Sequence, residues 1–169
     1  MPRGVWADQN DSRLETLFVR LLEAPGPGEA LPAEAAIWQI WLQSDDGAVQ
    51  GLMRDGLEAM SRGDYRHALT KFDQMVLIAP DFAEGWNKRA TVHYLLGTYA
   101  ASLGDIAKTL ELEPRHFGAL AGRGLVYMAL EDERRALKAF EAALAIHPNL
   151  TSAILNAERL RKIIREREI

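Results

Sequence analysis

The strongest constraint on this chain is a spacing of 34 residues that recurs along most of its 169-residue length. Pro80, Pro114 and Pro148 lie 34 residues apart, and each follows an apolar stretch with helical character. Proline cannot continue a helix, so each marks the end of one. A fixed period with the same residue types in the same places is typical of stacked structural repeats. The sequence therefore predicts a repeat array.

Other positions share this spacing and alternate between small and large side chains. The small residues let two paired helices approach closely, and the large ones are expected to fill the space between successive units. These positions are Gly56, Ala90 and Gly124, then Ala68, Ser102 and Ala136, then Phe72, Ile106 and Phe140.

A turn signal divides each unit into two helices. In Gly63-Asp64 and Gly97-Thr98, a glycine that can end a helix in the left-handed conformation precedes a side chain that can cap the next helix. The third unit has Glu131-Asp132 instead. Because Glu131 replaces glycine, we expect this turn to be strained or differently shaped.

With these positions in register, the sequence resembles the tetratricopeptide repeat (TPR) family, whose pattern is W-x2-L-G-x2-Y, A-x3-F and P. The matching residues are Gly56, Ala68, Phe72 and Pro80, then Trp86, Ala90 and Pro114, then Gly124, Tyr127, Ala136, Phe140 and Pro148. Asp55, Arg89 and Arg123 depart from it, because they replace the leucine of the pattern. The resemblance implies an all-α fold, a right-handed superhelical α-solenoid, with repeats at 49–82, 83–116 and 117–148.

Both ends of the array are expected to be capped, since a terminal repeat otherwise exposes an apolar face. Residues 12–48 form a degenerate repeat, a hairpin of helices near 12–23 and 32–43, joined by a longer loop that contains Pro25-Gly26-Pro27-Gly28. Residues 149–169 form a capping helix. Its predicted inward residues are Ile154, Leu155, Leu160, Ile163 and Ile164.

Residues 1–11 have two interpretations. They are either a disordered N-terminus or the remnant of a signal peptide, because Val5-Trp6-Ala7 resembles the end of a cleavage site. The compartment is therefore open: cytoplasmic by default, and periplasmic if a truncated signal is present.

Composition excludes several classes of protein. With no Cys, the chain has no disulfide, thiolate zinc site or iron-sulfur cluster. Its 20 Lys+Arg against 24 Asp+Glu give a net charge of -4, the wrong sign for a dedicated nucleic-acid binder. No apolar run reaches the roughly 18 residues of a membrane-spanning helix, so we expect no membrane insertion.

No pattern indicates catalysis, a cofactor or a metal. None of the four histidines has a second ligand at metal-binding spacing, and the glycine-rich 118–124 stretch lacks the Lys-Ser or Lys-Thr of a phosphate loop. The segment Ser44-Asp45-Asp46-Gly47 indicates a turn in which Ser44 or an Asp caps the next helix. We therefore expect a protein that is not an enzyme.

The resemblance implies that the first helix of each repeat lines a concave groove. Helical spacing selects its lining as Met53, Leu57, Met60, Asn87, Thr91, Tyr94, Ala121, Leu125 and Met128. Asn87 is the sharpest choice, since its amide can bond a peptide backbone or a neighbouring repeat. The N-terminal hairpin folding back to bury this lining is the alternative.

The predicted function is that of an adaptor that binds a peptide or helix of an unidentified partner protein in this groove. A carboxylate clamp like that of chaperone-binding TPR domains is disfavoured, because only Lys88 and Asn87 remain at its positions. Two other functions stay open. They are a helical-repeat RNA binder, which the charge and the apolar groove oppose, and a self-assembling module or homo-oligomer.

Overall fold

The computed structural model describes residues 8–167, and every regular element within that range is helical. A short 3-10 turn, η1 (Asp8–Asn10), precedes the α-helices. These are α1 (Arg13–Glu23), α2 (Pro27–Leu42), α3 (Gly47–Ser61), α4 (Tyr65–Ile78), α5 (Ala83–Leu95), α6 (Tyr99–Leu112), α7 (Phe117–Ala129), α8 (Glu133–Ile146) and α9 (Thr151–Arg167).

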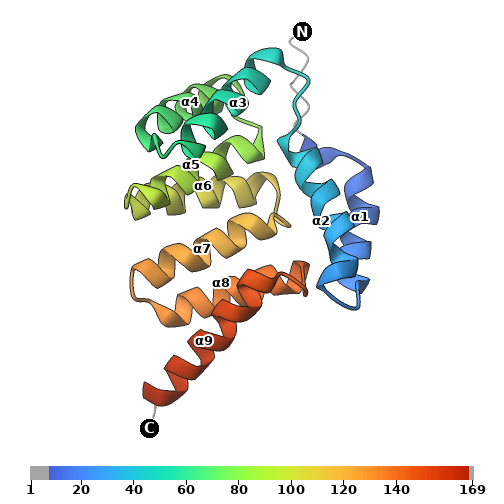
Figure 1. Cartoon of the computed structure of the whole chain (residues 1–169), viewed down its shortest axis with the longest axis vertical. Helices are drawn as coiled ribbons and strands as arrows, with labels where there is room; N and C mark the ends of the chain where they lie inside the picture. The colour runs from blue at the N-terminus through green and yellow to red at the C-terminus, as the bar shows by residue number, and fades with distance from the viewer. Residues whose placement is uncertain (1–7, 168–169) are drawn as a thin grey trace.

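The three helix pairs α3/α4, α5/α6 and α7/α8 stack one upon the next, and α9 packs against α8 at the end of the stack (Figure 1). Each pair contains one 34-residue unit of the sequence pattern. Apolar clusters lie within and between the pairs. The core is therefore continuous along the array.

Residue size is matched across the two helices of each repeat. A Cβ added at Gly56 would lie 2.6 Å from the Phe72 ring, and one at Gly124 would lie 2.7 Å from the ring of Phe140. In the second repeat, Ala90 shares a buried cluster with the smaller Ile106. We expected both rings to fill the space between successive repeats. Instead, each ring lies against the glycine of its own repeat.

The turns inside the three repeats have one shape. Gly63 and Gly97 have φ of 74° and 75°, and Glu131 has φ of 58°. The expectation of strain at Glu131 is thus confirmed, because a side chain is disfavoured in the left-handed region.

The capping side chains differ between these turns. Asp64 accepts from the backbone N–H of His67, and Asp132 accepts from that of Arg135. The predicted cap at Thr98 is wrong: its hydroxyl donates to the carbonyl of His93 at 3.0 Å and makes no bond to the next helix. Asp46 caps α3 through the N–H groups of Ala48 and Val49, as expected for that turn.

The N-terminal hairpin is more compact than expected. The connection between α1 and α2 is only Ala24–Gly26, because Pro27 begins α2. Proline is tolerated there since the first N–H of a helix has no helical partner. The longer loop that we predicted from the proline-glycine segment is therefore wrong.

The residues before α1 fall in two parts. Residues 1–7 lie outside the described range. For them, a disordered N-terminus and a signal-peptide remnant both stay predictions. In the described part, Gln9 donates to the carbonyl of Asp81 at 2.7 Å, which ties this segment to the end of the first repeat.

The capping helix α9 buries a smaller face than expected. Ala153, Ala157 and Leu160 are buried. Leu155 is 61% exposed, so the prediction that it points inward is wrong. Ile154, Ile163 and Ile164 are half-buried. Among the described helices, none is long and apolar enough to cross a membrane.

The hairpin α1/α2 lies along one side of the array and does not continue the stack (Figure 1). Arg115 pairs with Glu15 at 2.7 Å, and Asn149 donates to the carbonyl of Ala24 at 2.8 Å. These contacts join α1 and the residue after it to residues just before and just after the third repeat.

Candidate functional site

The first helices of the second and third repeats, α5 and α7, contact each other directly and enclose a small hollow of about 60 Å³. Small residues on both helices and α6 make room for it. Its lining is Asn87, Ala90, Thr91, Tyr94, Ser102, Ile106, Gly118, Gly122 and Leu125. We call this the groove hollow.

Four of the groove residues selected from the sequence line this hollow: Asn87, Thr91, Tyr94 and Leu125. Thr91 and Leu125 are exposed and Tyr94 is half-buried. The structure therefore brings together the selected residues of α5 with one residue of α7.

The other selected residues lie elsewhere. Met53 is only 4% exposed and belongs to the core of the first repeat, against which Leu57 and Met60 also pack. Ala121 and Met128 are half-buried against the core of the third repeat. Met53 is thus not accessible, and we leave it out of the candidate surface.

Asn87 is not available in the way its residue type suggests. It is 7% exposed, and its amide nitrogen lies 3.2 Å from both carboxylate oxygens of Glu84. The partner is on the same helix, one turn earlier. The Asn87 amide therefore bonds within the chain, as the alternative interpretation expected. Its partner, however, is in its own repeat and not in a neighbouring one.

Glu84 is the centre of a buried polar cluster. It is 1% exposed, and it accepts from Lys88 Nζ at 2.9 Å and faces His116 Nε2 at 2.8 Å. The N–H of Ala119 donates to His116 Nδ1, so Nε2 carries the proton that is donated to Glu84. Glu84, Lys88 and both ring nitrogens of His116 each have a partner, as buried polar groups require.

The charge state of Glu84 follows from these partners. Burial alone raises the pKa of this carboxyl, but the positive charge of Lys88 and the hydrogen bond from His116 outweigh burial and hold the pKa below the usual range of a glutamate. Glu84 is therefore ionised at neutral pH. Sequence reasoning missed this cluster, because it depends on a contact between residues 32 positions apart.

Two tryptophans of the hairpin cover this cluster. The Trp41 ring stacks on His116 with centroids 4.0 Å apart, and Lys88 Nζ lies 5.3 Å from the centre of the Trp38 ring. A Cβ added at Gly118 would lie 2.5 Å from Trp38. The hairpin thus occupies the Gly118 end of the groove, where only a residue without a side chain fits.

This arrangement combines features of the two interpretations of the groove. The hairpin covers the end beside Lys88 and Gly118, and it leaves Thr91 and Leu125 exposed further along. The groove is therefore partly filled by the chain's own N-terminal helices.

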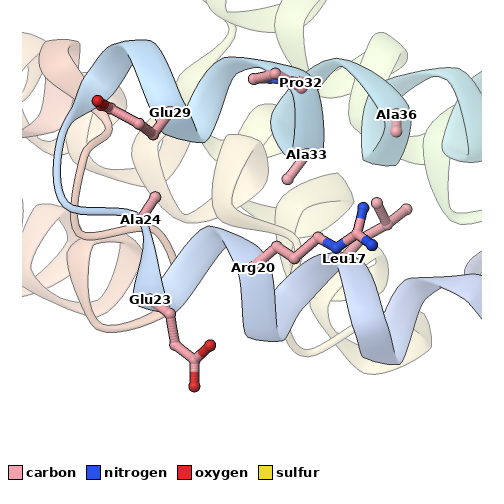
Figure 2. A pocket seen from close by; sticks show the side chains of 8 residues that line it. All are labelled: Leu17, Arg20, Glu23, Ala24, Glu29, Pro32, Ala33 and Ala36. Carbon is pink, nitrogen blue, oxygen red and sulfur yellow. The ribbon is translucent and has the colours of Figure 1, made fainter.

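A larger hollow of about 460 Å³ lies between α1 and α2 on the hairpin. Figure 2 shows Arg20 extended beside Leu17 on one helix and Ala36 on the other, with Glu23 directed away. The same hollow includes Glu29, so its charges are mixed, and it presents no set of side chains suited to one ligand.

Three of the four histidines make structural contacts through their side chains. His116 and His147 are fully buried, and His147 Nε2 lies 3.1 Å from Glu34 of the hairpin. His93 Nδ1 is 2.8 Å from the hydroxyl of Thr98. Within residues 8–167, no group of three His, Cys, Asp or Glu side chains is placed to hold a metal ion.

Comparison with known proteins agrees with this geometry. The family model described as Tetratricopeptide repeat matches residues 117–150, the third helix pair. A TPR repeat-containing protein of Rhizobium etli is 35% identical over 136 residues, which are 80% of this chain and 67% of that protein. A BBSome complex member, the BBS4 homologue of Drosophila melanogaster, is 28% identical over 56% of this chain, but that match spans only 20% of its own length.

Among solved structures, the first TPR of Spaghetti (RPAP3) bound to the HSP90 peptide SRMEEVD superposes with a TM-score of 0.68 at 21% identity. The match covers 72% of this chain and 96% of that one. This likeness establishes a shared helical solenoid fold. The repeat period, the three stacked helix pairs and the Rhizobium relative together place this chain in the tetratricopeptide repeat family.

Proposed function

We propose that this chain is a non-catalytic adaptor that binds a segment of another protein along the uncovered part of its concave groove. The observation that carries the proposal is the groove hollow between α5 and α7, with Thr91 and Leu125 exposed at its edge. A domain of the same fold was solved with a peptide of another protein bound to it, which supports this class of function.

The chemistry of the hollow favours an apolar side chain of the partner. Ala90, Ile106 and Leu125 offer apolar surface, while the nearby polar groups of Asn87 and Glu84 already satisfy each other. Burying a methyl or isobutyl group there removes apolar surface from water at both partners, at about 25 cal/mol per Å².

The same contacts oppose recognition of a free C-terminal carboxylate. Lys88 is held by Glu84 and the Trp38 ring, and Gly118 and Gly122 stand where a clamp needs cationic side chains. Lys88 and Asn87, the two donors left at the clamp positions, are both paired with Glu84 and are not free to bind a partner's terminal carboxylate.

The test compares protein capture from a lysate by three versions of the chain. Leu125→Glu places a charge in the groove, and Leu77→Glu places the same charge on α4, where Leu77 is 81% exposed. We expect partners to be retained by the wild type and the α4 variant and lost from the groove variant, with helical content unchanged by circular dichroism. Equal capture by both variants would exclude the groove as the binding surface.

A further inference from the structure

One position between the two helices of a repeat carries a charged pair in the first two repeats. In the first, Asp55 lies 3.8 Å from Lys71 Nζ. In the second, Arg89 lies 2.7 Å from Asp105 and 3.0 Å from Asp73 of the preceding repeat. The pair changes sign between repeats but stays balanced.

The third repeat keeps the arginine and loses both acids. Stepping 34 residues from Arg89, Asp105 and Asp73 leads to Arg123, Ala139 and Ala107. Within the described part of the chain, Arg123 has neither an ion pair nor a hydrogen bond. The guanidinium that two carboxylates neutralise in one repeat is therefore unneutralised in the next.

A hollow of about 240 Å³ stands at this place, between α7 and α8. Its lining is Arg123, Tyr127, Arg135, Lys138 and Ala139. Lys138 also has no ionic partner among residues 8–167. Arg135 lies over the Tyr127 ring at 4.7 Å and pairs with Asp132, so its charge is already balanced. Two unbalanced cations thus face one hollow.

We propose that this hollow binds an aspartate or glutamate side chain from an acidic segment of a partner protein, which supplies the carboxylate that Ala139 and Ala107 lack. The proposal rests on the proposed adaptor function, because the carboxylate comes from a bound protein. The site shares no lining residue with the groove hollow, so it is a second contact point.

A carboxylate fits better than a nucleic-acid backbone. The forked guanidinium donates two parallel hydrogen bonds to a carboxylate, as Arg89 does to Asp105 through Nε and Nη2. In the second repeat the equivalent place is filled by the Asp105 carboxylate, so this position already accommodates a group of that size and charge.

The test measures binding of an acetylated and amidated hexaglutamate peptide to the whole chain by calorimetry at low salt. Hexaglutamine and hexauridylate serve as comparison ligands. Arg123→Gln removes the unbalanced guanidinium, and Ala139→Asp recreates the pair of the second repeat. Arg66→Gln, on the exposed face of α4, is the matched control for lost charge.

We expect saturable hexaglutamate binding that weakens about tenfold or more in Arg123→Gln and Ala139→Asp and is unchanged in Arg66→Gln. Absence of saturable binding to the wild type, equal affinity of Arg123→Gln, or tighter binding of hexauridylate would overturn the proposal. If Ala139→Asp does not fold, Arg123→Gln decides the question. Leu125→Glu should retain hexaglutamate binding. A failure of this proposal is therefore distinguishable from a failure of the proposed groove function.

Discussion

The pairing of glycine with phenylalanine makes a sharp prediction for packing within a repeat. Gly124→Ala would ordinarily stabilise a helix interior by about 1 kcal/mol. Here the new Cβ would lie 2.7 Å from two ring atoms of Phe140, which is 1% exposed and cannot move into solvent. Overpacking of this kind costs about 1–3 kcal/mol, so we expect a net loss of stability.

The second repeat shows how the clash is relieved. It pairs Ala90 with Ile106, so the double variant Gly124→Ala, Phe140→Ile reproduces a combination that the chain already uses. Phe140→Ile alone should cost about 1–2 kcal/mol through the space it leaves. The double variant should be more stable than the sum of the two single changes by about 1 kcal/mol or more.

Urea unfolding of the four proteins gives this coupling energy, and Gly104→Ala supplies the control. Gly104 lies within α6 with no atom within 4 Å of an added Cβ, so alanine there should stabilise by about 1 kcal/mol. If Gly124→Ala is as stabilising as Gly104→Ala, or if the double variant is simply additive, the explanation by helix approach is wrong.

Three further predictions concern the turn, the buried cluster and the groove. Glu131→Gly should raise the free energy of unfolding by about 1 kcal/mol, because glycine relieves the left-handed strain at φ of 58°. Urea unfolding measures this change, and a lower unfolding midpoint than that of the wild type would contradict it. The pKa of Glu84 is lower in the folded than in the unfolded chain, so its contribution to stability is fully present above the unfolded pKa and is lost as pH falls through the folded pKa. Glu84→Gln should flatten this acid limb of the unfolding free energy, and an unchanged limb would exclude Glu84 as its source. The peptide SRMEEVD should bind equally with a free or an amidated C-terminus in calorimetry, whereas a tenfold preference for the free acid would show a working carboxylate clamp.

Periodicity predicted the helical array because the relevant information is local. The spacing of the prolines, the turn at Gly63 and the small-residue positions all report on one helix pair and its neighbour. Thr98 shows where this reasoning ends. Its hydroxyl can accept from an N–H of the next helix or donate to the carbonyl of His93, and the residue type does not choose between the two.

The site was only partly predictable, because the hairpin contributes to it from a distance in sequence. Helical spacing selected Thr91 and Leu125, and the structure places both at one hollow. It could not reveal that Trp38 covers Gly118, since no periodic pattern connects the hairpin to the third repeat. Arg123 departs from the repeat pattern in the sequence. Its lack of carboxylate partners is recognised only by comparison with Arg89, which forms ion pairs with Asp73 and Asp105 in the structure.

The placement of the hairpin has a consequence for how the chain is made on the ribosome. Trp41 emerges early, yet its stacking partners His116 and Phe117 follow more than seventy residues later. At about 5–20 residues per second, that delay is roughly 4–15 s. During this time the apolar face of α2 waits for its partner, open to chaperones and to neighbouring nascent chains. Closure of the hairpin onto the third repeat is therefore a late event, and it couples the first part synthesised to the completion of the array.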